Sequence, residues 1–428
     1  MSKTAFIECT NRLNKNSFNA LTGALESNPT LHDVEVYFWD NDDIEFVEEI
    51  IKKNYKYIVI GFSFFTTNIL ETYNKLTTIR NKFGDSVICI AGGPHPSGEP
   101  KSVLDLGFDY VLVGEGEEVI NEFFSYVEAG KDVKEIKGVY SKNGENDYSY
   151  QPRITKVDLN KYYPFSEKYN RFGHIEITRG CPFACHFCQT TKLFGVCVRH
   201  RSLEFMQELM QILKRNGKTR SMRFITPNAF AYGSKDGKVV NLPAIQALLE
   251  MIRAEMPSCE IFLGSFPSEV RPEHVTDENM KVLTSFVKNN NIIMGAQTGS
   301  QRLLDLSHRG HTVEDIYRAV EISVKYKKKP NVDFLFGMPG ESYDDIMKTV
   351  RVMQDLIKMG ANIHAHTFMP LPQTVFADKK GGRIAAQIKT MIKKYIPNKI
   401  VYGDWIEQEN MAQKITEYLR SKNIADLE

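Results

Sequence analysis

The sequence predicts an α/β protein. We expect an N-terminal Rossmann-like (flavodoxin-like) domain, then a partial (β/α)6 TIM-like barrel, and last a C-terminal helical cap. Two patterns carry this prediction. Short apolar runs alternate with amphipathic stretches over the first 125 residues, and a similar alternation with longer units resumes at residue 173. Such alternation is typical of parallel sheets covered by helices. A chain of 428 residues is long enough for two or three domains.

The N-terminal domain is expected over residues 1–130. Helical patterns such as 44–53 and 69–82 separate its strand candidates, which are Thr4–Cys9, Val34–Trp39, Tyr57–Ser63, Val87–Gly93 and Tyr110–Val113. Ligands of such sheets lie beyond the carboxyl ends of the strands. Polar and glycine-rich segments follow three of these strands, at residues 63–68, 92–98 and 114–118. A ligand site is therefore predicted at this edge.

Residues 131–172 are predicted to form a hairpin and a linker, because 143–147 carries a hairpin signal and 158–169 is polar and aromatic. The barrel is expected over residues 173–375, with strand candidates at 174–179, 221–226, 260–266, 291–297, 331–337 and 362–368. Helical stretches such as 203–215, 242–254 and 313–326 intervene. Active sites of such barrels lie at the C-terminal ends of the strands. Residues 376–428 are rich in charged residues and predicted to be mostly helical.

Composition excludes several classes of protein. The chain has 54 Lys and Arg against 53 Asp and Glu, so its charge gives no general attraction to nucleic acid or to anionic membranes. No apolar run reaches the roughly 18–20 residues of a membrane span, and the N-terminus does not look like a signal peptide. Seven cysteines, three of them clustered, favour metal binding in a reducing compartment over a disulfide framework. We therefore expect a cytoplasmic protein without nucleic-acid or membrane partners.

Three clustered cysteines are the most informative residues of the chain. Cys181, Cys185 and Cys188 follow the first strand of the predicted barrel with the spacing Cys-x3-Cys-x2-Cys. Three thiolates can hold three irons of a [4Fe–4S] cluster and leave the fourth iron open for a substrate or cofactor. The alternative is a zinc site completed by His186 or by another cysteine. Gly180 and Pro182 favour a loop that can approach a cluster closely.

This motif and the segments that follow it resemble radical S-adenosylmethionine (SAM) enzymes, in particular the subfamily with an N-terminal cobalamin-binding domain. The resemblance extends to about residue 375. It implies that SAM binds the open iron and is cleaved to a 5′-deoxyadenosyl radical, with Phe187 near the adenine. Polar residues at later strand ends offer hydroxyl, amide and guanidinium groups to SAM. The SAM residues predicted in this way are Phe187, Thr226, Ser265, Gln297, Thr298 and Arg309.

The N-terminal strand ends are similar to the cobalamin-binding halves of this subfamily. The cobalamin contacts predicted there are Ser63, Thr66, Thr67, Gly92, Gly93, His95, Gly114, Glu115, Gly116 and Glu117. Many cobalamin domains carry an Asp-x-His-x-x-Gly motif whose histidine ligates cobalt. Here Cys9-Thr10-Asn11 stands after the first strand instead. Related methylases bind cobalamin without this histidine, and the alternative is a flavodoxin-like domain with no cofactor.

The resemblance implies a class B-type radical SAM C-methyltransferase, which methylates an unactivated carbon through methylcobalamin. A protein or peptide substrate is expected first and a small molecule second. In methanogens, enzymes of this kind methylate residues of methyl-coenzyme M reductase, including a glutamine, and this organisation would suit such a substrate. An electron donor such as ferredoxin or flavodoxin is implied. An open cluster would be oxygen-sensitive, which indicates anaerobic biology.

Three other functions remain open from the sequence. The first is a radical SAM reaction of another type, without functional B12. The second is a methylthiotransferase, but that family needs three further cluster cysteines in its N-terminal domain, and only Cys9 and Cys89 lie there. The third is a non-catalytic carrier of a corrinoid or a metal. Cleavage of SAM would separate the enzymes from the carrier.

Overall fold

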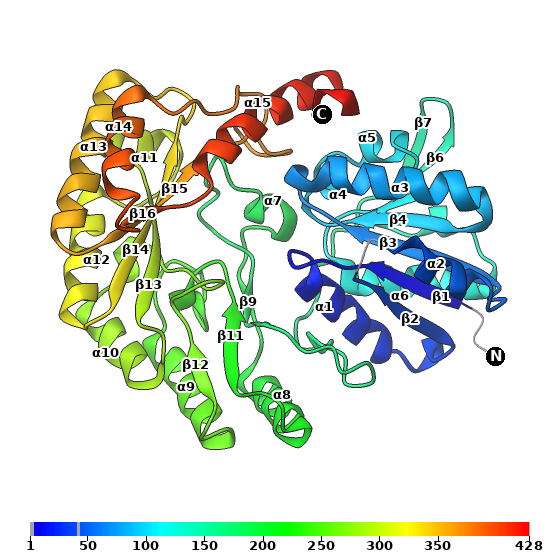
Figure 1. Cartoon of the computed structure of the whole chain (residues 1–428). Helices are drawn as coiled ribbons and strands as arrows, with labels where there is room; N and C mark the ends of the chain where they lie inside the picture. Colours follow the sequence, from blue (N-terminus) through cyan, green and yellow to red (C-terminus); the bar gives the residue numbers. More distant parts are fainter. Residues whose placement is uncertain (1–3, 41–42, 428) are drawn as a thin grey trace. The chain divides into compact units, whose positions relative to one another are not determined.

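The computed structural model describes residues 4–40 and 43–427. These residues form two units, which are treated separately below: unit 1 ends at Gly173, and unit 2 runs from His174 to Leu427. Both units are built of strands and helices in alternation (Figure 1). The predicted α/β class, with the Rossmann-like domain first and the barrel second, is confirmed.

Unit 1 contains a seven-stranded sheet with the order β2-β1-β3-β4-β5-β6-β7. The first five strands of this order are parallel, and the β5–β6 and β6–β7 pairs are antiparallel. The bounds are β1 Thr4–Cys9, β2 Val34–Trp39, β3 Tyr57–Ser63, β4 Ile88–Gly92, β5 Tyr110–Leu112, β6 Val139–Gly144 and β7 Asp147–Tyr150. The order 2-1-3-4-5 is that of flavodoxin-like folds, whose ligands bind where the strand order reverses, between β1 and β3.

Helices cover both faces of this sheet. Their bounds are α1 Lys15–Glu26, α2 Ile44–Ile51, α3 Ile69–Phe83, α4 Pro94–Gly98, α5 Pro100–Asp105 and α6 Gly116–Ala129. Helices α1 and α6 contact each other, and their apolar side chains join those of β1, β2 and β3 in one core cluster. Helix α3 lies on the opposite face (Figure 1). The predicted hairpin is present as β6 and β7, and β7 ends at Tyr150 because Pro152 has no N–H for the ladder.

Unit 2 contains an open barrel of parallel strands. One sheet has the order β12-β11-β8 and a second has the order β13-β14-β15-β16. The segment after β12 joins the two, because Ile293 donates its N–H to Gly264 and Val270 donates to Ile293, at 2.9 and 2.8 Å. The bounds are β8 Ile175–Glu176, β9 Thr178–Arg179, β10 Arg199–His200, β11 Ser221–Ile225, β12 Glu260–Phe262, β13 Asn291–Gln297, β14 Lys329–Phe336, β15 Asn362–Thr367 and β16 Val401–Tyr402.

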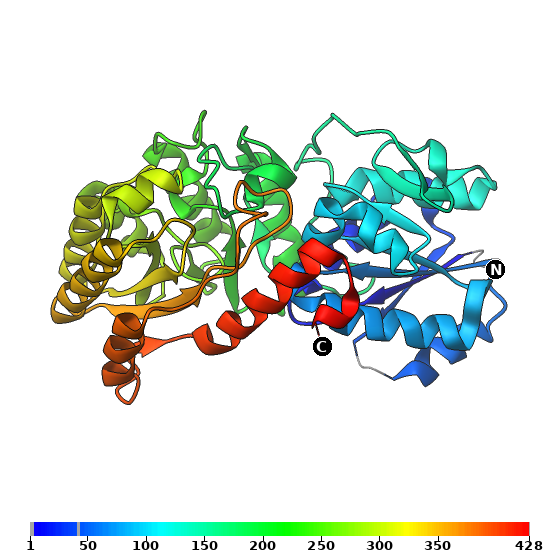
Figure 2. The ribbon, with the colours of Figure 1, turned by 90° about the horizontal axis from the view of Figure 1, so that it is seen from above.

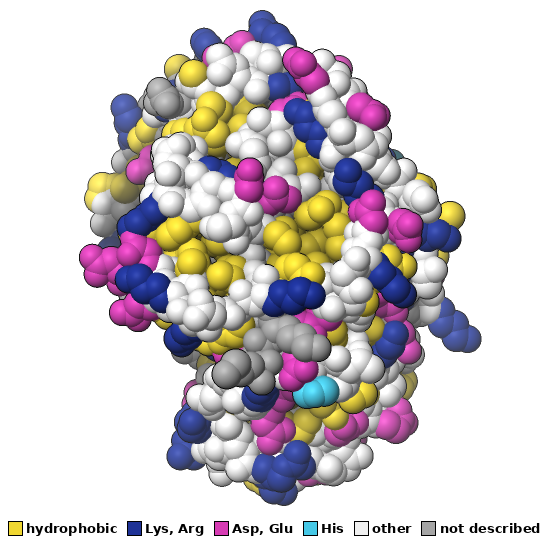
Figure 3. Space-filling view, turned by 90° about the vertical axis from the view of Figure 1, so that its right-hand side faces the viewer, with side chains coloured by type: hydrophobic (Ala, Val, Ile, Leu, Met, Phe, Trp, Pro, Cys, Tyr) yellow, Lys and Arg dark blue, Asp and Glu magenta, His cyan; other side chains and the backbone are white. Residues whose placement is uncertain are grey.

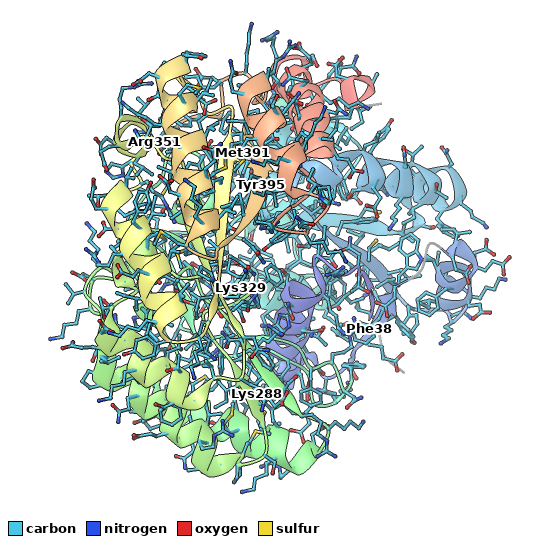
Figure 4. All side chains as sticks on the ribbon, turned by 60° about the vertical axis from the view of Figure 1, so that its left-hand side comes forward. Phe38, Lys288, Lys329, Arg351, Met391 and Tyr395 are labelled. Atoms are coloured by element: carbon cyan, nitrogen blue, oxygen red, sulfur yellow. The ribbon has the colours of Figure 1, made fainter. Side chains whose placement is uncertain are left out.

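Most helices of unit 2 lie outside these strands, whereas the short helix at residues 190–194 lies in the loop between β9 and β10 (Figures 1 and 2). The helices of unit 2 are α7 Thr190–Phe194, α8 Leu203–Asn216, α9 Leu242–Glu255, α10 Asp277–Phe286, α11 Gln301–Leu306, α12 Val313–Lys325, α13 Tyr343–Lys358, α14 Ala386–Tyr395 and α15 Trp405–Ser421. Figure 4 marks α13 by Arg351 and α14 by Met391 and Tyr395, and these two helices contact each other. The C-terminal region is mostly helical, as predicted, but it also adds β16 to the sheet beside β15.

Two barrel strands differ most from the prediction, and several others end one residue earlier than predicted. The strand expected at 260–266 ends at Phe262, because Gly264 turns the chain with a φ of +83°. The strand expected at 174–179 divides at Ile177 into β8, which pairs with β11, and β9, which pairs with β10. This division starts the cysteine loop directly after Arg179. Among the described residues, no helix is both long enough and apolar enough to cross a membrane.

Candidate active site

The three clustered cysteines lie in a loop that follows β9. Its backbone is held by Cys181 N–H donating to Gly195 O at 3.1 Å and by Cys188 N–H donating to Cys185 O at 3.0 Å. Gly180 has a φ of +94°, and a Cβ there would lie 2.3 Å from the Cys197 carbonyl oxygen. Only glycine therefore allows the loop to turn back so close to its own return segment.

All three cysteines line one cavity of about 350 Å³. Burial, followed by the charges of Cys185 and Cys188, raises the pKa of the Cys181 thiol. The Cys181 sulfur therefore lies close enough to those of Cys185 and Cys188 for their charges to act on it. Three thiolates that face one cavity fit a [4Fe–4S] cluster with one open iron. The cavity is lined by Glu176, Thr178, Arg179, Cys181, Phe183, Cys185, Phe187, Cys188, Thr190, Thr191, Phe194, Ile225, Thr226, Pro227, Asn228, Glu269, Arg271 and Arg309.

Two arginines bring positive charge to this cavity. Arg309 donates from Nη1 to Cys185 Sγ at 3.6 Å and from Nη2 to the Gly295 carbonyl at 2.9 Å. The Arg271 guanidinium lies 3.4 Å from the centre of the Phe183 ring and is 4% exposed. Burial, followed by the charge of Arg309, lowers the pKa of Arg271. Arg271 is paired with Glu273 at 2.5 Å, and Arg309, which contacts Cys185, would offset the negative charge of a thiolate-bound cluster.

The predicted SAM residues divide into two groups. Phe187, Thr226 and Arg309 line the cavity with the cysteines. Ser265, Gln297 and Thr298 do not line it. Thr298 is 1% exposed, and its hydroxyl lies 3.0 Å from that of Thr349 on α13, so it joins the strand to an outer helix.

Several lining residues were not assigned a role from the sequence. Arg179 forms an ion pair with Glu176 at 2.6 Å, and both side chains line the cavity. Asn228, and Glu269 and Arg271 in the loop after β12, line it as well.

 Of these, Glu269 and Arg271 lie in the segment 267–272, whose acidic and basic side chains between two prolines are the one signal that could have drawn attention to them.

In unit 1, the carboxyl ends of the central strands are joined by hydrogen bonds. The Asn14 amide donates to the carbonyls of Cys9 and Ser63, at 3.0 and 2.9 Å, and so connects the ends of β1 and β3. The Phe64 N–H donates to the Gly92 carbonyl at 3.3 Å and connects β3 to β4. The strand ends that sequence reasoning selected therefore lie side by side at the point where the strand order reverses.

The predicted cobalamin residues after β3 and β4 are of two kinds. Thr67 is exposed, whereas Thr66 is 1% exposed, and its hydroxyl lies 3.0 Å from Nδ1 of His95. His95 is 0% exposed and its ring stacks on Phe64, so it supports the loop from inside. Gly93, which follows Gly92 at the end of β4, has a φ of +94°, and a Cβ there would lie 2.9 Å from the Ser63 hydroxyl oxygen.

The predicted residues after β5 lead into α6. The Gly114 N–H donates to the Ser97 hydroxyl at 2.9 Å, and a Cβ on Gly114 would meet no atom within 4 Å. Glu115 and Glu117 are 8% and 6% exposed, and Gly116 begins the helix. Two apolar side chains at the same edge are exposed: Leu13 by 58% and Phe65 by 42%. Open space, hydroxyl groups and exposed apolar surface suit a large ring with amide side chains.

Comparisons with known proteins agree with this geometry. Residues 175–353 match the Radical SAM superfamily, and residues 4–124 match the B12 binding domain. An uncharacterized methyltransferase of Pyrococcus horikoshii is 24% identical over 341 residues, which cover 76% of this chain and 70% of the relative.

Two solved structures share the fold. The radical S-adenosylmethionine methyltransferase TsrM from Kitasatospora setae, with cobalamin and a [4Fe-4S] cluster bound, has a TM-score of 0.68 at 18% identity, and the match covers 89% of this chain and 75% of that one. The cobalamin-dependent S-adenosylmethionine radical enzyme OxsB, with aqua-cobalamin bound, has a TM-score of 0.65 at 16% identity, covering 82% of this chain and 52% of that one.

The two family matches fall on the two halves of the chain in the predicted order, so the predicted resemblance is confirmed. The same matches bear out the predicted cofactors, which are a [4Fe–4S] cluster, SAM and cobalamin. The chain therefore carries a B12-binding domain at residues 4–124 and, after it, a radical SAM domain at residues 175–353.

Proposed function

We propose that this protein is a radical SAM C-methyltransferase that moves a methyl group from SAM, by way of cobalamin, to an unactivated carbon. When bound, the cluster supplies the electron that cleaves SAM, and cobalamin carries the methyl group. The observation that supports this most directly is the cavity in unit 2, which three cysteines line together with Phe187, Thr226 and Arg309. The methyltransferase name of the Pyrococcus relative supports the reaction type.

The residues of unit 2 would hold and orient the reacting groups. Cys181, Cys185 and Cys188 would ligate three irons, and Arg309 would stabilise their negative charge through Cys185. Phe187 offers an aromatic face for the adenine, and Thr226 offers a hydroxyl group. Glu269 lines the same cavity, and burial raises the pKa of its carboxyl group.

In unit 1 we propose that cobalamin binds without a histidine below the cobalt. Among the described residues of this unit the histidines are His32 and His95. His32 precedes β2 and therefore lies at the amino edge of the sheet, opposite the strand ends that would hold the ligand. His95 is completely buried beneath its loop. The segment after β1, where the ligating histidine would stand, carries Thr10 and Asn11 instead.

For the methyl acceptor we propose a protein or peptide side chain, with a small molecule as the alternative. A glutamine of methyl-coenzyme M reductase is the specific candidate. The electron for the cluster would come from a ferredoxin or a flavodoxin. These proposals rest on the family resemblance.

The test uses the full chain, reconstituted under anaerobic conditions with iron, sulfide and hydroxocobalamin. With dithionite and SAM, we expect the wild type to form 5′-deoxyadenosine and Cys188→Ala to form none. Cys197→Ala is the matched control, because Cys197 is exposed and does not line the cavity. Absence of SAM cleavage by the wild type would refute the proposal that the protein is an enzyme and would favour a non-catalytic carrier of a corrinoid or a metal. Normal cleavage by a protein that retains no corrin would refute the methylation route.

The acceptor is tested with SAM that carries a deuterated methyl group. A peptide of methyl-coenzyme M reductase that contains the candidate glutamine is incubated with the reconstituted enzyme, and mass spectrometry locates the label. Label on a glutamine carbon is the expected result. Cleavage of SAM without label on the peptide would reject this acceptor and leave the radical reaction itself intact.

A further inference from the structure

A second group of possible metal ligands lies in unit 2, away from the cysteines. Asp333 is on β14, and His364 and His366 are on the neighbouring strand β15. One ligand atom of each residue lies within 4.8 Å of the other two. None of the three residues lines the cysteine cavity, but Glu269, which does line it, lies close enough to Asp333 and His364 for their charges to affect its pKa.

The sheet register brings the three side chains together. Asp333 pairs with His364 across the two parallel strands, and His366 follows His364 by two residues, which places it on the same face. The alternating burial of β14 and β15 shows which face this is. Val332, Phe334 and residues 363 and 365 are buried, whereas the three candidate ligands are only partly buried. They therefore lie on the face of the sheet opposite its apolar core face, which is the inner face of the open barrel.

Two of the three distances among the ligand atoms fit a shared cation, and the third is below 4.8 Å. His364 Nδ1 lies 3.1 Å from Asp333 Oδ1 and 3.0 Å from His366 Nε2. Ligand atoms about 2.1 Å from a zinc ion are about 3.0–3.4 Å apart, for angles between octahedral and tetrahedral. Two histidines and one carboxylate form a common ligand set for zinc and for non-haem iron(II).

The protons of the network also favour an ion. The Gln408 carbonyl accepts from the Thr367 N–H at 2.9 Å, which leaves the Gln408 amide nitrogen facing His366 Nδ1 at 3.5 Å. If His366 Nδ1 accepts a hydrogen bond from Gln408, the proton of His366 is on Nε2, which then donates to His364 Nδ1. His364 Nδ1 therefore carries no proton of its own, and its lone pair faces a lone pair of Asp333 Oδ1 at 3.1 Å. The other tautomer turns two donors toward each other at Gln408, at the longer distance of 3.5 Å. A cation among the three ligand atoms removes the closer conflict.

The His364 ring is held in place from its other sides. Tyr402 on β16 stacks on it with ring centres 4.6 Å apart and an angle of 11° between the planes. Gly403 leaves room for the ring, because a Cβ there would lie 3.0 Å from His364 Cδ2. The His364 and Asp333 side chains are 31% and 17% exposed, which leaves an open path for an ion. Fixed ligands with a route from solvent are what a metal site requires.

We propose that Asp333, His364 and His366 bind one divalent transition-metal ion, with zinc as the first candidate, on the inner face of the barrel. The three residues leave at least one coordination position for water or for an oxygen or nitrogen donor of a bound molecule. This proposal does not depend on the methyltransferase reaction. A hydrogen-bonded Asp–His–His chain without metal is the competing account of the same contacts.

The test measures zinc binding directly. The full-length chain, in the Cys181→Ala, Cys185→Ala, Cys188→Ala background so that no cluster thiolate competes, is dialysed against Zn²⁺. We expect one equivalent of tightly bound zinc. His364→Gln, His366→Gln and Asp333→Asn should each weaken binding by at least about tenfold. His32→Gln is the matched control, because the His32 side chain is 75% exposed and lies in unit 1. It should bind zinc like its parent.

Co²⁺ in place of Zn²⁺ provides a second readout, since its visible spectrum reports the geometry of nitrogen and oxygen ligands. Far-UV circular dichroism of each variant checks that it is folded. The proposal is overturned if the parent protein binds no zinc, or if His366→Gln and Asp333→Asn, both folded, still bind it as tightly as the parent. In the second case the zinc lies elsewhere.

Discussion

Gly93 permits the sharpest test of the proposed cobalamin edge. It lies between β4 and α4 with a φ of +94° and a ψ of −171°. This combination belongs to a backbone region that is essentially restricted to glycine. A Cβ at this position would lie 2.9 Å from the Ser63 hydroxyl oxygen and 3.0 Å from the Phe64 nitrogen. Gly93→Ala should therefore separate the ends of β3 and β4.

The expected cost has two parts. Backbone strain in this region is about 1–3 kcal/mol, and forcing a methyl group into a closely packed site costs about 1–3 kcal/mol more. Gly130→Ala is the matched control, because Gly130 also has a positive φ, +66°, but a Cβ there would meet no atom within 4 Å. Gly130→Ala should be destabilised only by the left-handed backbone conformation, which costs about 1–2 kcal/mol.

Calorimetry of the full chain and the corrin content after reconstitution are the two assays. A difference of 1 kcal/mol in the free energy of unfolding corresponds to a shift of about 2–4 °C in the melting temperature of a domain of this size. We expect Gly93→Ala to melt at least that far below Gly130→Ala and to bind less cobalamin. Equal melting and equal corrin content in the two variants would show that the close contact between β3 and β4 does not exist as described.

Three further predictions concern other parts of the chain. Burial raises the pKa of Glu8 from the ordinary value of 4.5 to about 8. Because the unfolded chain loses this proton at a lower pH than the folded protein, the free energy of unfolding should fall as the pH rises from about 4.5 to about 8. Urea titrations at several pH values should show this slope for the wild type and not for Glu8→Gln. Asp345 accepts hydrogen bonds from Ser300 and Ser342 and pairs with Arg302. Asp345→Asn should therefore lower the free energy of unfolding by about 1–3 kcal/mol, as measured by urea denaturation. Asp344→Asn, at an exposed position, should lower it by less than about 0.5 kcal/mol in the same assay. Arg309→Gln removes a positive charge 3.6 Å from Cys185 Sγ, so a redox titration followed by electron paramagnetic resonance should give a lower cluster potential than in the surface variant Arg318→Gln.

Charge on the face seen in Figure 3 gives no comparable guide to function. In the view of Figure 3, acidic and basic side chains are interspersed, in keeping with 54 Lys and Arg against 53 Asp and Glu. Tests of function therefore belong at the two candidate sites and not at a charged face.

The sequence was sufficient to predict a strand's bounds where the residues of that strand alone form a clear pattern. Strands β1, β2, β3 and β13 have the predicted bounds, because each is an apolar run with polar residues or a turn after it. The sequence was insufficient where a strand forms only because it pairs with a neighbouring strand. Strands β10 and β16 have two residues each and form only because β9 and β15 offer partners.

Thr298 shows the same limit at the candidate active site. Its place after a strand predicted a contact with SAM. The register of β13 against β14 shifts between Gly295 and Gln297, and Gln297 has a φ of +71°. Such an irregularity re-aims the side chains that follow it, and Thr298 faces Thr349 on an outer helix. A pattern of single residues cannot show this shift.

The inner face of the barrel also explains why polar residues deserve a functional account here. Strand β14, which begins at Lys329 (Figure 4), and strand β15 bury Val332, Phe334, Ile363 and Ala365 on their other face. Barrels that need only stability fill their interiors with valine, isoleucine and leucine, since a polar group in a partly buried place costs free energy unless it is paired. An aspartate and two histidines in this position therefore indicate a bound ligand more strongly than they indicate a stabilising core.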